Sequence, residues 1–307
     1  MIDLEWYGYV IIIVVFILLF WMYIGLYVAM EIVTPSVKTL NQTEVEEASR
    51  DESLLLYLRE NLTNQYQIKS IYGYMLQVYE MVKDPENNKF VVIAHGYTYS
   101  HHGAIKYGKM MMDLGYNVIL YDHRFHGLSG GKNTTLGYYE KDDLKTVIDH
   151  VYQTYGDVFL GTYGESMGSA TVLLEQQNDP RVRFVVSDAG FKDLSSLIRY
   201  RLKVKGLFPL LVFPMTKLFI YFISKAKFNQ VSPIEALKNQ TIPMMFVHGE
   251  QDDFIGYQDS IDMFESYQGP KHLYIAKKEA YHARSYYANK EEYFNELSQF
   301  LSQYELI

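Results

Sequence analysis

A serine stands between two glycines in the segment Gly164-Glu165-Ser166-Met167-Gly168. An apolar stretch typical of a buried strand, Val158–Tyr163, precedes this segment, and a helical pattern follows it. A serine at such a sharp strand-to-helix turn needs small neighbours, because the backbone there is strained and closely packed. We therefore predict that Ser166 is a nucleophile and that the backbone N–H of Met167 is a donor to an oxyanion. The alternative is a tight turn without chemistry.

A serine nucleophile needs a general base. Three histidines follow Ser166 in the chain, namely His248, His272 and His282. His248 ends a predicted strand, and His272 begins another at the opposite edge of the sheet. His282 lies just beyond the carboxyl end of a predicted strand, where open sheets form their active sites. We predict that His282 is the base.

The base in turn needs a carboxylate to orient it. Asp252 lies in an acidic loop directly after the predicted strand Met244–His248, which places it where it can face His282. We predict Asp252 as this carboxylate. Alternatives are Glu250 and Asp253 in the same loop and Asp188 at the end of the preceding strand, and each could simply be a solvated charge.

A second oxyanion donor is expected after the apolar segment Val91–Ala94, where His95-Gly96-Tyr97 follows. Gly96 allows the backbone to turn so that the N–H of Tyr97 faces the developing charge. We interpret His95 as a structural loop residue. A metal site built from His95, His101 and His102 is a disfavoured alternative, and we predict neither a metal nor a cofactor.

Short apolar stretches alternate with helical patterns from about residue 69 onward. The predicted strands are 71–82, 90–95, 117–122, 158–163, 184–188, 244–248 and 272–276, and the predicted helices are 102–115, 139–155, 167–178, 257–268 and 288–304. Such alternation predicts an α/β fold with a mostly parallel sheet that helices cover on both faces. Residues 190–240 interrupt the alternation with helical segments at 194–205 and 207–227, which we interpret as a cap over the carboxyl edge of the sheet.

No charged residue occurs from Trp6 to Met30. At about 1.5 Å per residue, a helix of this length spans roughly 37 Å, enough for a hydrocarbon core of about 30 Å. The acidic start, Met1–Glu5, is unlike the basic start of a signal peptide. We therefore predict a transmembrane anchor at 1–30, a polar connector with some helix at 31–65 and a catalytic domain at 66–307. The alternatives are a cleaved signal peptide and a buried core helix.

The overall composition is that of a globular protein of 307 residues, of which 49% are hydrophobic and 21% charged. The net charge of −8 disfavours nucleic acid as a partner. The absence of cysteine excludes disulfides, a cysteine nucleophile and thiolate metal sites.

Five ordered segments together resemble the α/β-hydrolase superfamily, over about residues 70–305: His95–Tyr97, Tyr121–Gly127, Gly164–Gly168, His248–Asp252 and Tyr281–His282. The closest group by this resemblance is the membrane-anchored bacterial hydrolases related to prolyl-oligopeptidase-like and Bem46-like proteins. The resemblance implies a triad of Ser166, Asp252 and His282, and an oxyanion hole at Tyr97 and Met167.

The same resemblance bears on the loop beneath the site and on the location of the protein. It implies that the segment Asp122–Gly127 shapes the floor of the site, and Phe125 departs from the glycine that the family often has there. Members of this group often face outward on the cell envelope. We therefore expect a single-pass protein of the cell membrane, with its catalytic domain outside the cytoplasm. The alternative is a cytoplasmic domain, toward which the positive-inside rule leans because Lys38 and Arg50 follow the apolar segment and no lysine or arginine precedes it.

The predicted cap combines basic and apolar residues. Between Lys192 and Lys227 the single acid is Asp193, whereas the basic side chains include Arg199, Arg201, Lys203 and Lys205. Apolar surface flanked by lysine and arginine suits a helix that lies on anionic lipid. We predict that this cap contacts membrane lipids and admits a lipid-like acyl substrate. A cap that only covers the core is the alternative.

These patterns favour a serine hydrolase that cleaves an ester or thioester through an acyl-enzyme, as a carboxylesterase or lipase does. A serine peptidase or amidase with the same triad is one alternative, and a membrane scaffold that has lost activity is another. The sequence leaves acyl length and oligomeric state open.

Overall fold

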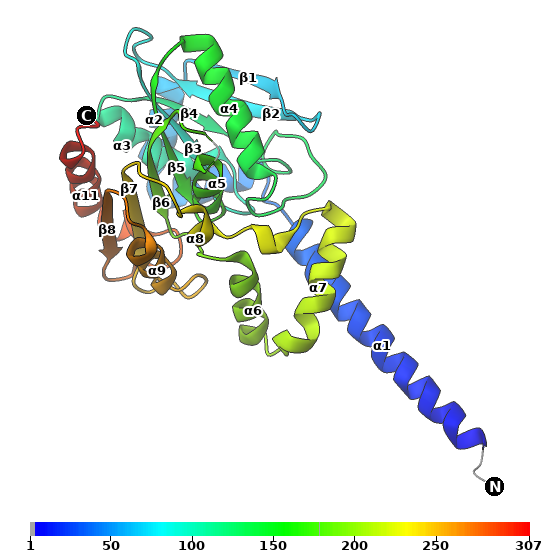
Figure 1. The fold of residues 1–307 in the computed structure, drawn as a ribbon. Coiled ribbons are helices and arrows are strands. Elements are labelled where there is room, and N and C mark those ends of the chain that lie inside the picture. The colour runs from blue at the N-terminus through cyan, green and yellow to red at the C-terminus, as the bar shows by residue number, and fades with distance from the viewer. Residues whose placement is uncertain (1–3, 178) are drawn as a thin grey trace.

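Within residues 4–177 and 179–307, which the computed structural model describes, eight strands form one sheet in the order β1-β2-β4-β3-β5-β6-β7-β8 (Figure 1). Strands β3 to β8 are all parallel, while β2 runs antiparallel to both β1 and β4. The strands are β1 Asn64–Lys69, β2 Met75–Met81, β3 Lys89–Ala94, β4 Asn117–Tyr121, β5 Phe159–Glu165, β6 Val182–Asp188, β7 Met244–Gly249 and β8 Lys271–Ala276. The predicted α/β fold with a mostly parallel sheet is confirmed.

Helices follow most of the strands and cover both faces of the sheet (Figure 1). The α-helices are α1 Leu4–Val33, α2 Leu40–Asn61, α3 Ile105–Asp113, α4 Glu140–Tyr155, α5 Met167–Gln176, α6 Leu194–Val204, α7 Pro209–Ser224, α8 Pro233–Ala236, α9 Gln258–Ser266, α10 Ser285–Ala288 and α11 Lys290–Gln303. Two short 3₁₀ segments, η1 His101–Ala104 and η2 Phe228–Gln230, complete the described elements.

The central strand β3 shows how the sequence builds two cores. Its side chains alternate between the two faces of the sheet, because successive residues of a strand point to opposite sides. Val91 and Ile93 pack with residues of α2, α3 and α11 on one face. Phe90, Val92 and Ala94 pack with residues of α4, α5 and α9 on the other. Both faces are dry, so the strand is apolar along nearly its whole length.

The segment predicted as a polar connector with some helix is mostly helical. It contains α2, which packs against α3 and η1, and the first residues of edge strand β1. Strand β1 is an exposed edge strand in which only Tyr66 and Ile68 are partly buried, and this short alternation of polar and apolar residues is not among the strands predicted from the sequence. The turn Ile71–Tyr74, predicted as the start of a strand, separates β1 from β2.

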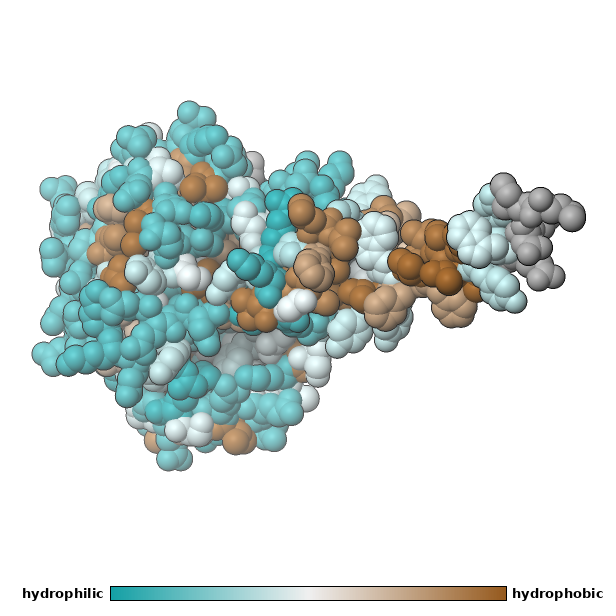
Figure 2. All heavy atoms as spheres, turned by 90° about the horizontal axis from the view of Figure 1, so that it is seen from below, coloured by the Kyte–Doolittle hydropathy of each residue, from teal (hydrophilic) through white to brown (hydrophobic). Residues whose placement is uncertain are grey.

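Helix α1 projects from the body, and α7 lies beside its last turns (Figure 1). The stretch Trp6–Val33 is long and apolar enough to cross a membrane, and very little of it is buried, so α1 is a candidate membrane anchor. Figure 2 shows apolar side chains along this projecting helix, whereas much of the body is hydrophilic. Helices α6 and α7, with the loop between them, form the α6–α7 hairpin (residues 194–224), which lies within the predicted cap region.

Candidate active site

Ser166 lies at the turn from β5 into α5 with φ 56° and ψ −110°, a left-handed conformation that costs free energy in a residue other than glycine. Its N–H donates to the carbonyl oxygen of Asp188 at 2.8 Å, which holds the turn. The flanking glycines are required by close packing. A Cβ at Gly164 would lie 2.2 Å from the carbonyl oxygen of Gly168, and a Cβ at Gly168 would lie 2.1 Å from that of Ala94.

His282 lies in the loop between β8 and α10, at the carboxyl edge of the sheet. Its Nε2 is 2.9 Å from the Oγ of Ser166, although 116 positions separate the two residues in the chain. The following residue, Ala283, has φ 56°, so the backbone turns sharply just after the imidazole. The ring of Phe254 lies 5.0 Å from the imidazole, centroid to centroid.

Asp252 follows β7 and is buried beside His282. Its Oδ2 accepts from the Nδ1–H of His282 at 2.7 Å, and its Oδ1 accepts from the backbone N–H groups of Phe254 and Ile255 at 2.9 and 2.8 Å. Burial favours the neutral acid, but hydrogen bonds from His248 and His282 outweigh it and hold the pKa of Asp252 well below its usual range. Asp252 is therefore an ionised acceptor that can orient the imidazole.

His248 has a supporting position that the sequence did not indicate. Its Nε2 lies 2.9 Å from the carbonyl oxygen of Ile255 and 3.1 Å from Oδ2 of Asp252, and its Nδ1 lies 2.7 Å from the hydroxyl of Ser260. Because a carbonyl oxygen can only accept, Nε2 carries the proton and Nδ1 accepts from the hydroxyl. His248 thus donates a second hydrogen bond to the carboxylate that holds His282.

The alternative acids and the remaining histidine are engaged elsewhere. Glu250 pairs with Lys277 at 2.7 Å, and Asp188 accepts from the hydroxyls of Tyr107 and Tyr293 at 2.8 and 2.9 Å. Asp253 is exposed. His272 lies 2.6 Å from Glu296. Of the candidate residues, the structure brings together Ser166, His282 and Asp252.

The loop after β3 carries Tyr97 to the same edge of the sheet. Its hydroxyl lies 2.9 and 3.0 Å from the carbonyl oxygens of Glu31 and Ile32, so the loop is tied to the end of α1. A Cβ at Gly96 would lie 3.2 Å from Glu165 and 3.7 Å from Cβ of Ser166. Tyr97 and Met167 line one cavity together with Ser166, and their role as oxyanion donors stays a prediction.

The segment Asp122–Gly127 lies below this loop. His126 accepts at Nε2 from the backbone N–H of Thr98 at 3.0 Å, and His95 accepts at Nε2 from the backbone N–H of His123 at 2.9 Å. His95 therefore joins two loops through its ring. Phe125 has φ 66°, a conformation that favours glycine, so this position of the loop is strained.

An apolar cavity of about 690 Å³ opens beside Ser166. Its walls come from α1, α6, the start of α5 and the loop after β7, and they include Val28, Leu197, Ile198, Leu202 and Phe254. Its volume falls in the range of about 300–1,000 Å³ that is usual for small-molecule sites. We call it the apolar cavity.

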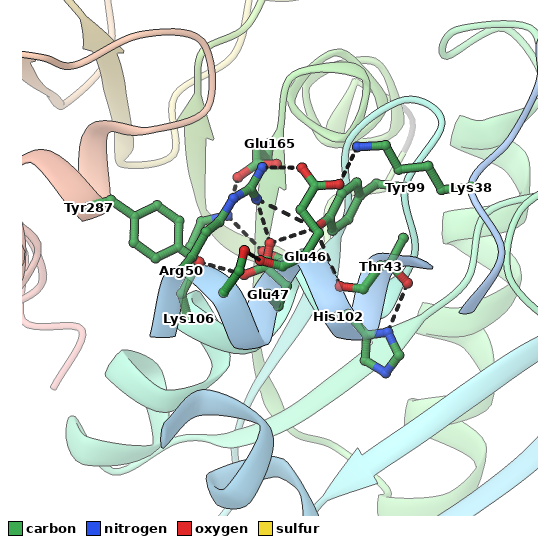
Figure 3. Close-up of polar contacts among 12 residues, drawn as sticks. Lys38, Thr43, Glu46, Glu47, Arg50, Tyr99, His102, Lys106, Glu165 and Tyr287 are labelled. Atoms are coloured by element: carbon green, nitrogen blue, oxygen red, sulfur yellow. Dashed lines mark hydrogen bonds and ion pairs between the residues drawn. The ribbon is translucent and has the colours of Figure 1, made fainter. Parts of the chain in front are cut away.

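A second cavity of about 350 Å³, here named the polar cavity, meets Ser166 from another side and includes His282 in its lining. Lys38 and Arg50, from the segment predicted as a connector, also line it. Both cations bind Glu46, at 2.5 Å each, and Arg50 binds Glu47 as well (Figure 3).

The polar cavity is backed by a buried charge network. Lys106 forms an ion pair with Glu165, the residue before the nucleophile (Figure 3). Burial disfavours the charged form of Glu47, but Lys106, Arg50 and hydrogen bonds from neighbouring tyrosines hold its pKa below the usual value. The network therefore keeps its charges paired, and it ties α2 to the elbow that carries Ser166.

The four basic residues singled out in the cap lie in different surroundings. Arg199 stacks on Phe213, and Lys203 is exposed. Arg201 donates to the carbonyl oxygen of Asp253 at 3.2 Å and stacks on Phe254, and Lys205 pairs with Glu31 at 2.6 Å. Arg201 and Lys205 thus hold the hairpin to the site and to α1, and both line the apolar cavity.

Sequence reasoning missed three parts of this site: the contribution of α1 to the apolar cavity, that of α2 to the polar cavity, and the support from His248. Only α2 left a signal, since Glu46, Glu47 and Arg50 are spaced as ion-pair partners on one helix. Among residues 4–177 and 179–307, no group of three or more histidine, aspartate or glutamate side chains is arranged to hold a metal ion.

Comparisons with known proteins agree with this architecture. Residues 85–234 match a family described as serine aminopeptidase, S33. The uncharacterized protein YqkD of Bacillus subtilis (strain 168) is 34% identical over 238 residues, which are 76% of this chain and 77% of YqkD.

Among solved structures, the Pyrococcus furiosus esterase PF2001 superposes with a TM-score of 0.64 at 22% identity, covering 78% of this chain and 91% of the esterase. Est1E from Butyrivibrio proteoclasticus, with ferulic acid bound, gives 0.62 at 16% identity, covering 79% and 100%. A membrane phospholipase A described as a bacterial virulence factor gives 0.62 at 14% identity, covering 85% and 93%. At these identities the likeness concerns the fold.

The narrower resemblance to the prolyl-oligopeptidase-like and Bem46-like group stays a prediction. The shared fold, the matched family and the 34% identity to a relative of similar length establish the broader group. The chain belongs to the α/β-hydrolase family and is a hydrolase.

Proposed function

We propose that this protein is a serine carboxylic ester hydrolase that cleaves esters or thioesters with an apolar acyl chain. The observation that carries the proposal is the hydrogen-bonded series from Ser166 through His282 to Asp252, at 2.9 and 2.7 Å, with Ser166 in the lining of an apolar cavity. The esterases and the phospholipase of the same fold are consistent with it.

In the proposed reaction, the Oγ of Ser166 attacks the acyl carbon while Nε2 of His282 takes its proton. Asp252 accepts from Nδ1–H and stabilises the imidazolium that forms. The N–H groups of Tyr97 and Met167 bind the oxyanion, and each donor of this kind typically contributes about 3 kcal/mol. His282 then gives its proton to the leaving group, and water cleaves the acyl-enzyme.

The two cavities suggest where the acyl chain and the leaving group of the substrate bind. His282 must reach the leaving oxygen, and it lines the polar cavity together with Lys38 and Arg50. Met167 lines the apolar cavity. We therefore place the acyl chain in the apolar cavity and a polar leaving group in the polar cavity.

The name of the matched family makes peptide hydrolysis the second candidate, with the same residues in the same roles. A direct comparison separates the two: p-nitrophenyl esters of increasing acyl length against a library of peptides, each with the wild-type protein in detergent. Ester hydrolysis that rises with acyl length supports the proposal. Cleavage of peptides with little activity on any ester contradicts it.

We propose that α1 crosses the membrane and that the α6–α7 hairpin contacts lipid. Arg199 and Lys203 are exposed at the hairpin, whereas Arg201 and Lys205 are tied to the body. Replacing both exposed residues with glutamine is expected to lower the preference for substrate in anionic over neutral vesicles about 30-fold, since each cation near such a surface contributes about 1 kcal/mol and about 1.4 kcal/mol corresponds to a factor of ten.

The control for that experiment is the double variant Lys83→Gln with Lys89→Gln. These residues lie at the amino ends of the parallel strands, whereas the hairpin lies at their carboxyl ends. The control protein should keep the wild-type preference for anionic vesicles. An equal loss in both double variants would show that the hairpin does not interact with the lipid surface.

We also propose that the catalytic domain lies outside the cytoplasm, as the sequence resemblance implies. The chain has no cysteine, so one introduced at exposed Lys83 becomes its single thiol. That thiol should react with a membrane-impermeant maleimide in intact cells. Reaction only after the cells are lysed would place the domain inside.

A further inference from the structure

We propose that α1 is a wall of the acyl-binding site as well as an anchor, and that bilayer-held acyl chains reach Ser166 between α1 and the α6–α7 hairpin. The inference rests on the proposed ester hydrolysis. It names the substrate class as esters of long acyl chains that lie in a membrane, and it makes residues of the anchor determinants of chain-length preference.

The apolar cavity carries the first step of the argument. One cavity runs from Ser166 and Met167 to the last turns of α1, where Tyr27, Val28 and Ile32 form part of its lining. Residues of α6 face them across the cavity, and Val28 is buried there, at 5% exposure. An acyl chain bound to Ser166 and extended into this cavity therefore contacts α1.

The last turns of α1 are fixed to the body. The indole N–H of Trp21 donates to the carbonyl oxygen of Leu211 at 2.6 Å, and a Cβ at Gly25 would lie 2.5 Å from Cβ of Met215. Trp21 of α1 contacts Leu211 of α7, and Gly25, four residues later in α1, contacts Met215, four residues later in α7. The two helices therefore pack side by side and run in the same direction. With the bonds from Tyr97 and Lys205 to Glu31, they make α1 a built part of the domain.

The same contacts place the hairpin relative to a bilayer. At about 1.5 Å per residue, Trp21 lies roughly 22 Å along the helix from Trp6. In a hydrocarbon core of about 30 Å that begins near Trp6, Trp21 is then about 8 Å inside the other boundary. Phe208, just before α7, and Leu210, in its first turn, lie near Leu211 and so near this depth, and they are 74% and 92% exposed. Such a depth is usual for amphipathic helices at a membrane surface, about 5–10 Å.

The mouth of the cavity follows from that geometry. Tyr27 lies six positions beyond Trp21, about 9 Å further along α1 and so near the boundary of the hydrocarbon core. Glu31 lies one turn further, at headgroup level. An acyl chain can therefore pass from the adjacent leaflet along α1 into the cavity. Transfer from lipid into an apolar cavity avoids the cost of about 0.8 kcal/mol per CH₂ that exposure to water would impose.

The test places a larger side chain on α1 where it lines the apolar cavity. Val28→Phe in the full chain, in detergent micelles, should lower the kcat/KM ratio of p-nitrophenyl dodecanoate to p-nitrophenyl acetate at least tenfold, because the acetate does not reach α1. The matched control is Val15→Phe, the same change at an exposed position of α1 distant from the cavity, and it should keep the wild-type ratio. A ratio for Val28→Phe within twofold of wild type would overturn the inference.

A second variant and labelling with a fluorophosphonate distinguish a filled cavity from a misfolded protein. Val28→Ala enlarges the cavity and should shift the preference toward longer acyl chains, so an unchanged chain-length profile also counts against the inference. Reaction of Val28→Phe with a short-chain fluorophosphonate at the wild-type rate shows that its fold and nucleophile are intact. If that reaction is lost, the inference is judged by the chain-length profile of Val28→Ala. A wild-type protein that cleaves neither ester refutes the proposed function itself.

Discussion

Replacing Ser166 with alanine is expected to lower kcat for ester hydrolysis by about 10⁴–10⁶-fold, down to the residual activity that binding and the oxyanion donors supply. The change removes the atom that forms the acyl-enzyme, and the hydroxyl is the one that lies 2.9 Å from His282. Reaction with a fluorophosphonate probe should be lost with it, since the probe bonds to the same oxygen. Both are measured on the full chain in detergent, with an ester of the preferred acyl length.

The control is Ser169→Ala, three positions after Ser166 in the first turn of α5. Its hydroxyl is buried and lies 2.6 Å from that of Ser187, away from the imidazole. This variant should retain labelling and keep kcat within severalfold of wild type. If Ser166→Ala kept more than a tenth of the activity and its labelling, Ser166 would not be the nucleophile.

The second large effect is expected for Asp252→Asn, about 10⁴-fold in kcat; that magnitude is the known cost of the equivalent change in a serine protease triad. The reason lies in the four hydrogen bonds that Asp252 accepts. Two backbone N–H groups bind Oδ1, so the amide oxygen of asparagine keeps that place. The amide nitrogen then faces His282 where Oδ2 had accepted its Nδ1–H. A donor meets a donor, His282 takes the other tautomer, and its Nε2 can no longer accept the proton of Ser166.

The pH profile and a neighbouring variant give this prediction its controls. Hydroxide can replace the lost base, so the residual activity of Asp252→Asn should keep rising with pH where wild type levels off. Asp253→Asn changes an exposed carboxylate next to it and should alter kcat less than threefold. Equal losses in the two variants would mean that Asp252 does not orient His282.

The position of His248 suggests why Asp252 can be both buried and charged. An isolated buried carboxylate is costly, and each hydrogen bond to the ionised form offsets part of that cost. His248 supplies one such bond from its own strand β7, at 3.1 Å, independently of the loop that carries His282. The hydrogen bond from His248 therefore supports the ionised carboxylate from a strand of the sheet.

The sequence determined the elements whose signals are local. The alternation of apolar residues predicts most strands, and the glycines around Ser166 predict the elbow because a side chain at either position would collide with backbone. The position of His282 after a strand placed it at the active edge, since parallel strands end together. The apolar run of α1 likewise identified a candidate membrane helix from composition alone.

Tertiary structure decided which distant groups meet. Glu250, Asp252 and Asp253 are equivalent by type and nearly by position, and only the fold of their loop turns Asp252 toward His282 and Glu250 toward Lys277. The roles of Lys38, Arg50 and Val28 were invisible in the sequence, because each depends on a cavity lined by residues far away in the chain. Local patterns encode local conformation, whereas a binding cavity exists only between segments that packing brings together. That is why the nucleophile could be read from the sequence and the cavity that surrounds its substrate could not.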